Sequence, residues 1–201
     1  MTTRALAVLF SLLAMTARAE DTVHLVTLEA RATRFSTQLG DSAVSILSPL
    51  GMGLSYAFRT RAAWQFSAQG VGVFGKKSVL LYGTGVHVDY ALLGGQSTAY
   101  TGPDSSVFSV RYPYRVGVFL GGVQRAFSLD GYVQKTTVTF QKKLPTRGNF
   151  VGPEFGLSGE VPLGTSALVL AKVGYTQPVF LSDPEQEGAL FTLSVGMGTF
   201  L

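Results

Sequence analysis

The residues with the clearest catalytic potential lie around one histidine, His87. His87 and Asp89 are two positions apart, so on a β-strand both side chains point to the same face. A histidine beside a carboxylate can act as a general base, and Ser158, with Glu154 nearby on another strand, could supply the nucleophile of a hydrolase. Such a histidine is more often a hydrogen-bonded packing residue. Catalysis by His87, Asp89 and Ser158 is therefore the minor alternative.

Few residues are suited to hold a metal ion or a cofactor. The chain has two histidines and no cysteine, which excludes disulfides, iron–sulfur clusters and thiolate zinc sites. Asp183, Glu185 and Glu187 could hold Ca²⁺ loosely or contact lipopolysaccharide bridged by divalent ions, but a solvated acidic loop is the simpler interpretation. We expect neither a metal nor a cofactor.

The first residues are typical of a secretory signal peptide. Arg4 precedes the apolar run 5–15, and Ala17-Arg18-Ala19 places small residues before a cleavage site, so we predict a signal peptide over 1–19. The run is shorter than the roughly 20 residues that a membrane helix needs. Loss of Arg4 and Arg18 lowers the formal net charge from +4 to +2. An exported chain of this charge is not expected to bind nucleic acid.

The remaining chain, 20–201, is predicted to be a single domain with an unusual composition. Of all residues 46% are hydrophobic and only 14% are charged, against roughly 25% charged in ordinary soluble domains. No apolar run approaches 18 residues, which argues against a membrane helix. In 50–58, however, large apolar residues alternate with small ones: Leu50, Met52, Leu54, Tyr56 and Phe58 share one face. This pattern predicts an all-β fold, a closed antiparallel transmembrane up-and-down β-barrel.

The C-terminal segment 191–201, FTLSVGMGTFL, repeats this alternation and ends on Phe200-Leu201. It resembles the last strand of small Gram-negative outer-membrane barrels, the class of the OmpA transmembrane domain, OmpX and OmpW. The resemblance implies residence in the outer membrane, with outer-membrane lipid and lipopolysaccharide as partners. It also implies that the barrel-assembly machinery recognises strand 191–201. The class includes structural anchors, adhesins, surface-resistance factors and a few lipid-modifying enzymes.

Eight strands are predicted from the alternating runs and the turn residues between them. They are 50–59, 62–74, 79–92, 107–120, 131–142, 149–161, 166–176 and 189–201. Segment 20–49 is then an N-terminal extension or an extra strand, because 22–35 also alternates. If 121–130 held a strand as well, the barrel would have ten. Counting back from the C-terminus places 93–106, 143–148 and 177–188 outside the cell and the turns 75–78 and 162–165 in the periplasm.

The charged residues of the predicted strands fall on the face opposite to the large apolar side chains. An Arg or Lys facing lipid at the midplane costs about 2–4 kcal/mol, so this face is assigned to the barrel interior. The predicted interior charge network is Arg59, Asp89, Arg111, Arg115, Lys135, Glu154, Glu160 and Lys172. An eight-stranded barrel is only wide enough for side chains to fill it, and buried charges are normally paired. We therefore expect ion pairs that plug the barrel.

Three functions are compatible with this prediction. The favoured one is a structural or surface-interaction role for a barrel with a polar, ion-paired interior. A channel for small solutes is the alternative, and a lipid-modifying enzyme that uses His87 is the third. A soluble, lipocalin-like periplasmic barrel would invert the inside and outside assignments. The sequence leaves the oligomeric state open.

Overall fold

The computed structural model describes residues 23–39, 42–60, 63–75, 79–94, 98–101, 107–110, 114–128, 147–163, 167–181 and 187–200. Several predictions concern residues outside these ranges: the signal peptide 1–19, the strand 131–142, and Arg111, Lys135, Asp183 and Glu185. In the described residues, no helix is long and apolar enough to cross a membrane.

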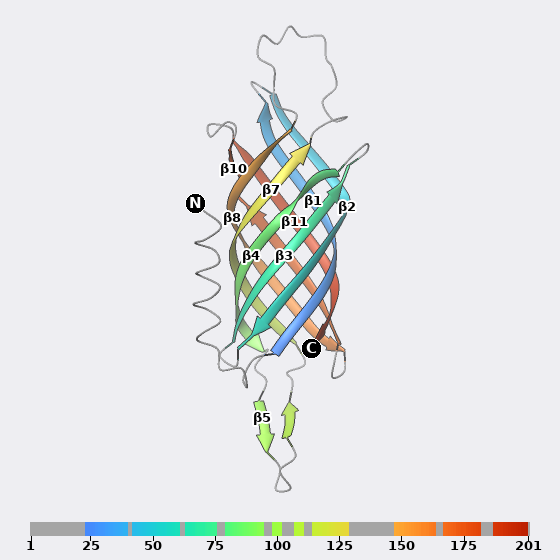
Figure 1. Cartoon of the computed structure of the whole chain (residues 1–201), viewed down its shortest axis with the longest axis vertical. Coiled ribbons are helices and arrows are strands. Elements are labelled where there is room, and N and C mark those ends of the chain that lie inside the picture. The colour runs from blue at the N-terminus through green and yellow to red at the C-terminus, as the bar shows by residue number, and fades with distance from the viewer. Residues whose placement is uncertain are drawn as a thin grey trace.

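Eight long antiparallel strands form a closed barrel (Figure 1). They are β1 (Val23–Leu39), β2 (Ser42–Arg59), β3 (Trp64–Phe74), β4 (Val79–Gly94), β7 (Arg115–Ser128), β8 (Arg147–Leu163), β9 (Ala167–Thr176) and β11 (Gly188–Phe200). Each strand pairs with its neighbour in chain order, and pairing of β1 with β11 closes the circle. The short β10 (Val179–Phe180) continues the line of β9 and pairs with β8. The predicted fold class is confirmed.

The alternation of side chains explains why these segments form a barrel wall. Along β7, buried and exposed residues alternate from Arg115 to Val118 and beyond, as the two-residue period of a strand requires. Large apolar residues on the outer wall are exposed; Leu54 is 59% and Leu120 62% exposed. Charged residues such as Glu29, Asp89 and Arg115 are buried in the lumen. This arrangement is the opposite of a lipocalin-like barrel.

The number of strands agrees with the prediction, but two of the strands differ. Segment 23–39 is a full barrel strand that pairs with β2 and β11, so the interpretation of 20–49 as an extension is wrong and its alternative, a strand, is right. The barrel strand predicted over 107–120 is instead 115–128. It includes 121–128, part of the segment 121–130 that was left open as a turn or a further strand. Its inward residues Val123 and Arg125 are buried, which stabilises this longer strand.

These differences change the end of the barrel at which two connections lie. We call the end with the first residue of β1 and the last of β11 the terminal end, and the opposite end the loop end. Because β1 is a strand, 75–78 lies at the loop end and the segment that begins at 93 lies at the terminal end. The predicted sides of 75–78 and 93–106 are therefore wrong relative to the termini. The connections at 162–165 and 177–188 lie at the predicted ends.

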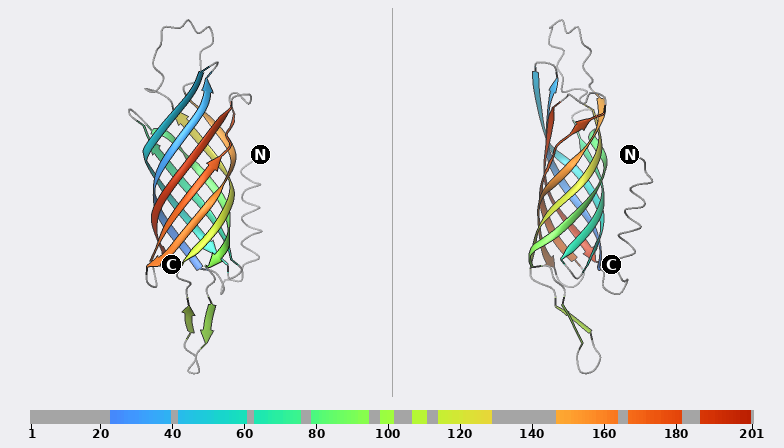
Figure 2. Two further views of the ribbon diagram at one scale, coloured as in Figure 1. Left: turned by 180° about the vertical axis from the view of Figure 1, so that it is seen from behind. Right: turned by 90° about the vertical axis from the view of Figure 1, so that its left-hand side faces the viewer.

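A small second sheet lies beyond the terminal end. β5 (Thr98–Thr101) and β6 (Val107–Val110) pair antiparallel with each other and with none of the described barrel strands. All three views show this hairpin projecting below the barrel (Figures 1 and 2). Part of the segment 107–120, which was predicted to form a barrel strand, is thus β6.

The lumen is filled in three layers. At the loop end, buried apolar side chains from seven barrel strands and β10 form the loop-end cluster: Phe35, Ile46, Val73, Leu80, Leu81, Val123, Phe127, Phe150, Phe180 and Leu190. At the terminal end, Leu25, Ala57, Leu168 and Leu170 form a smaller terminal cluster, against which Phe200 packs. Between these two clusters lies a layer of charged and polar side chains, which we call the ionic layer.

Candidate functional site

The half of the ionic layer nearer the loop end is organised around Glu29 of β1. Its carboxylate accepts hydrogen bonds from Arg31 Nη2 at 2.8 Å and from Lys172 Nζ at 2.8 Å. Arg31 also donates to the amide oxygen of Gln69 on β3. Glu29 is almost completely buried, and its carboxylate is shared by two cations, Arg31 of the same strand and Lys172 of β9.

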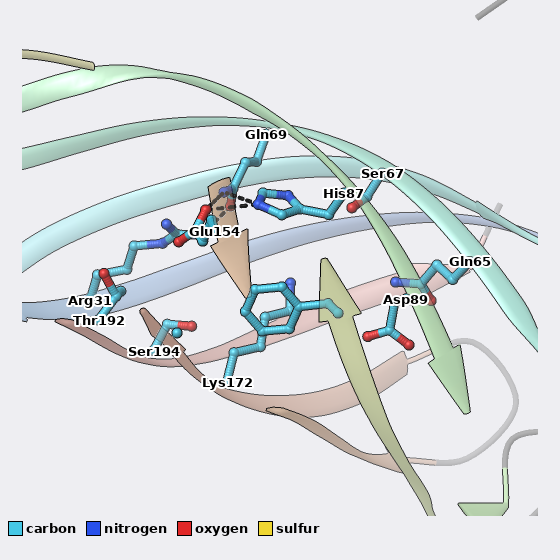
Figure 3. A pocket seen from close by; sticks show the side chains of 12 residues that line it. Arg31, Gln65, Ser67, Gln69, His87, Asp89, Glu154, Lys172, Thr192 and Ser194 are labelled. Atoms are coloured by element: carbon cyan, nitrogen blue, oxygen red, sulfur yellow. Dashed lines mark hydrogen bonds and ion pairs between the residues drawn. The ribbon is translucent and has the colours of Figure 1, made fainter. Parts of the chain in front are cut away.

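A second carboxylate of this half, Glu154 on β8, lies across the lumen from Glu29. His87 Nε2 lies 2.7 Å from Glu154 Oε2, and Gln69 Nε2 donates to the same oxygen at 3.2 Å (Figure 3). Arg125 Nη2 approaches it at 3.7 Å. Gln69 thus links the Glu29 and Glu154 groups into one network that spans the barrel.

The half nearer the terminal end contains two acids and two arginines. Arg115 bonds to Asp89 and has Nη1 3.5 Å from Glu160 Oε1. Arg59 Nη2 donates to Glu160 Oε2 at 2.5 Å, and Ser158 Oγ donates to Asp89 Oδ2 at 2.6 Å. Every acid here has a cationic partner, as buried charges require.

Glycines on the inner wall make room for the large lumenal side chains. Glu29 is paired with Gly53 on β2 and with Gly196 on β11. A Cβ at Gly196 would lie 2.9 Å from Glu29 Cγ, and a Cβ at Gly156 would lie 2.7 Å from Phe119 Cζ. The small residues that alternate with apolar ones in the sequence are thus the spaces into which charged and aromatic side chains from neighbouring strands extend.

A small cavity remains in the middle of the ionic layer. Its volume is about 30 Å³, enough for two or three waters at about 10–15 Å³ each. It is lined by Arg31, Gln65, Ser67, Gln69, His87, Asp89, Phe119, Glu154, Lys172, Gly174, Thr192 and Ser194 (Figure 3). Apolar clusters lie between this cavity and both ends of the barrel.

The structure separates the residues of the candidate catalytic set. His87 pairs with Glu154, whereas Ser158 donates to Asp89. No contact between His87 and Ser158 is found among the described residues, so the base and nucleophile of a hydrolase are not brought together. The other histidine, His24, accepts or donates a 2.6 Å hydrogen bond with the Tyr56 hydroxyl on the outer wall. Within the described ranges, no group of His, Asp and Glu side chains is arranged to hold a metal.

The structure places every described member of the predicted charge network in the lumen. These residues are Arg59, Asp89, Arg115, Glu154, Glu160 and Lys172. The prediction missed Glu29, Arg31 and Arg125. Glu29 and Arg31 could have been found from the polar face of 22–35, had that run been counted as a barrel strand. Arg125 was missed because its segment was not counted among the eight strands.

Comparisons with solved structures point to one kind of fold. The N-terminal β-barrel domain of OprF from Pseudomonas aeruginosa matches with a TM-score of 0.52 and 10% identity, over 88% of this chain and 97% of that domain. Neisserial surface protein A matches with a TM-score of 0.47 and 13% identity, over 87% and 96%. Ail, the attachment invasion locus protein of Yersinia pestis, matches with a TM-score of 0.48 and 12% identity, over 90% and 99%.

The strand pairing and the match to the OprF barrel domain define the fold of the chain. It has the closed eight-stranded fold of the small outer-membrane β-barrels. No family model matches the sequence, and no curated protein matches it. Solved proteins with this fold have different roles, so the function has to be argued from the lumen and the surfaces of this chain.

Proposed function

We propose that the protein is a closed outer-membrane barrel with a structural or surface-interaction role, which presents its connecting segments at the membrane faces and does not conduct solutes. The observation that carries this proposal is the filled lumen. The loop-end cluster, the ionic layer and the terminal cluster follow one another along the barrel axis. A path for a solute would have to displace all three layers.

The outer wall supports the membrane part of the proposal. Leucine, valine, methionine and aromatic side chains cover it, and residues such as Leu54, Leu120 and Met197 are about 60% exposed. Soluble monomers rarely expose continuous apolar surface on this scale. In lipid the same surface is solvated by acyl chains, while the backbone groups of a closed barrel are all paired.

Conductance measurement tests the proposal against the channel alternative. The purified barrel, inserted into planar lipid bilayers, is expected to give no step-like current, whereas an open porin measured in the same bilayers gives steps. Insertion is verified by gel electrophoresis with and without boiling, since a closed barrel migrates differently until it is heated. Reproducible steps from the heat-shifting wild-type protein would replace the proposal by a channel function.

The β5–β6 hairpin is the described segment best placed for an interaction at the terminal end. It pairs with no described barrel strand, so replacing 98–110 by a short turn should leave the heat-dependent gel shift unchanged. A barrel that no longer folds without the hairpin would assign β5–β6 to folding rather than to presentation.

A further inference from the structure

We propose that the cavity of the ionic layer binds one small monatomic anion of the size of chloride, which neutralises a surplus of positive charge in the closed lumen. The described charged side chains of the lumen are five cations, Arg31, Arg59, Arg115, Arg125 and Lys172, and four carboxylates, Glu29, Asp89, Glu154 and Glu160. One positive charge therefore has no carboxylate of its own. An unpaired buried charge is costly, which favours a counter-ion.

The surplus lies beside the cavity and not at the terminal end. In the terminal half, Arg59 and Arg115 balance Asp89 and Glu160. In the other half, three cations face only two carboxylates. Arg31 and Lys172 share Glu29, and both of these cations line the cavity.

The cavity offers hydrogen-bond donors that suit an anion. Thr192 and Ser194 lie on β11, on the side of the cavity opposite to His87 and Gln69 (Figure 3). Ser194 is 2% exposed, and no hydrogen bond within the described residues engages its hydroxyl or that of Thr192. Arg31 Nε is likewise buried without a partner there.

Three of the four carboxylate oxygens at the cavity already have donors. Asp89 Oδ1 is bonded by Arg115 and Asp89 Oδ2 by Ser158, and Glu154 Oε2 is bonded by His87 and Gln69. The volume of about 30 Å³ suits particles of roughly the size of water, which need about 10–15 Å³ each, and a monatomic anion is of that order of size.

Apolar clusters flank the ionic layer along the barrel axis, so the anion would be captured as the barrel folds. Binding to the folded state alone shifts the folding equilibrium by the factor 1 + [L]/Kd. The full-length mature protein is unfolded in urea and refolded in detergent micelles while potassium gluconate is replaced stepwise by potassium chloride at constant ionic strength. Above the dissociation constant, each tenfold rise in chloride should lower the unfolding equilibrium constant about tenfold, and bromide should act similarly.

Three variants separate this site from general salt effects. Lys172→Met removes the surplus cation, so the chloride dependence should disappear. Ser194→Ala should weaken the chloride dependence, whereas Ser158→Ala, which removes an equally buried hydroxyl that is already bonded to Asp89, should lower stability equally in chloride and gluconate. If Lys172→Met does not fold, the chloride titration of the wild type and the comparison of Ser194→Ala with Ser158→Ala still test whether the cavity binds chloride.

A direct structural test completes the experiment. Crystals of the wild-type barrel grown in bromide should show an anomalous peak between Lys172, Arg31 and Ser194. Water alone in the cavity, identical unfolding curves in gluconate and chloride, or a chloride dependence that persists in Lys172→Met would each overturn the proposal. None of these outcomes depends on whether the barrel conducts, so the proposed function is tested separately.

Discussion

The loop end and the middle of the lumen are filled from the same inward face of the same strands but by different chemistry. At the loop end, four phenylalanines, Phe35, Phe127, Phe150 and Phe180, pack with ring centroids 5.6–6.4 Å apart. In the middle, Glu29 accepts hydrogen bonds from Arg31 and Lys172 at 2.8 Å, and Glu154 lies 2.7 Å from His87.

The two layers differ in the amino-acid substitutions that they tolerate. Aromatic packing depends on contact area and accepts another apolar group of similar size at small cost. An ion pair depends on an identified partner, and removing one member leaves a buried charge without compensation. The loop-end cluster should therefore respond gradually to substitution, and the ionic layer abruptly.

The largest effect is expected at Glu29. Glu29→Leu leaves Arg31 and Lys172 without their shared carboxylate and should cost about 5 kcal/mol of unfolding free energy, the upper end of the roughly 3–5 kcal/mol for breaking a buried pair. The measurement is the urea midpoint in micelles, followed by the gel shift.

The control for this variant replaces the whole group by apolar side chains. In Glu29→Leu/Arg31→Met/Lys172→Met, most of the lost stability should return, because no charge remains unpaired. Equal losses in the single and triple variants would show that packing, and not charge, stabilises the layer.

The next largest effect is expected in the loop-end cluster. Phe150 is fully buried, and Phe150→Ala should cost about 3–4 kcal/mol through lost burial and the cavity left behind. Phe150→Leu should cost less than about 1.5 kcal/mol, since it keeps most of the volume. A similar loss in both variants would contradict the gradual response predicted for this layer.

The fold and the direction of the side chains were predictable because both follow from local alternation. Leu54 points outward and Glu154 inward, as period two predicts. Alternation does not determine which runs join the barrel. Closure depends on pairing between β1 and β11, which lie at opposite ends of the chain. The sequence of 22–35 alone does not show which strand it pairs with.

The ion-pair partners could not be predicted for a related reason. His87 and Asp89 share a face, but residues two apart on one strand are separated by about 6.6 Å. Across a narrow lumen a group on another strand comes closer, and Glu154 lies 2.7 Å from His87. Sequence spacing therefore identified the interior residues, while the register between β4, β7 and β8 determined the pairs.

A smaller effect is expected where a glycine makes room in the ionic layer. Gly156→Ala places a Cβ against Phe119 and the carbonyl of Val173 and should cost about 2 kcal/mol by overpacking. Gly159 on the same strand has open space around it, so Gly159→Ala is the matched control and should be nearly neutral. Equal effects at the two positions would show that strand flexibility, and not lumenal space, decides the tolerance.

The smallest effect is expected at His87, and it also tests the remaining enzymatic alternative. His87→Gln keeps an amide that can donate to Glu154, so the loss should be about 1 kcal/mol, as for one hydrogen bond. His87 lies between the two apolar clusters and pairs with Glu154 instead of Ser158, so a lipid substrate has no route to it. Analysis of outer-membrane lipid from cells that carry wild-type or His87→Gln protein should therefore show the same acylation. If the lipid acylation differed between the two cell lines while both proteins stayed folded, the lumen would have to open to lipid. The packed lumen described above would then be the resting state of an enzyme.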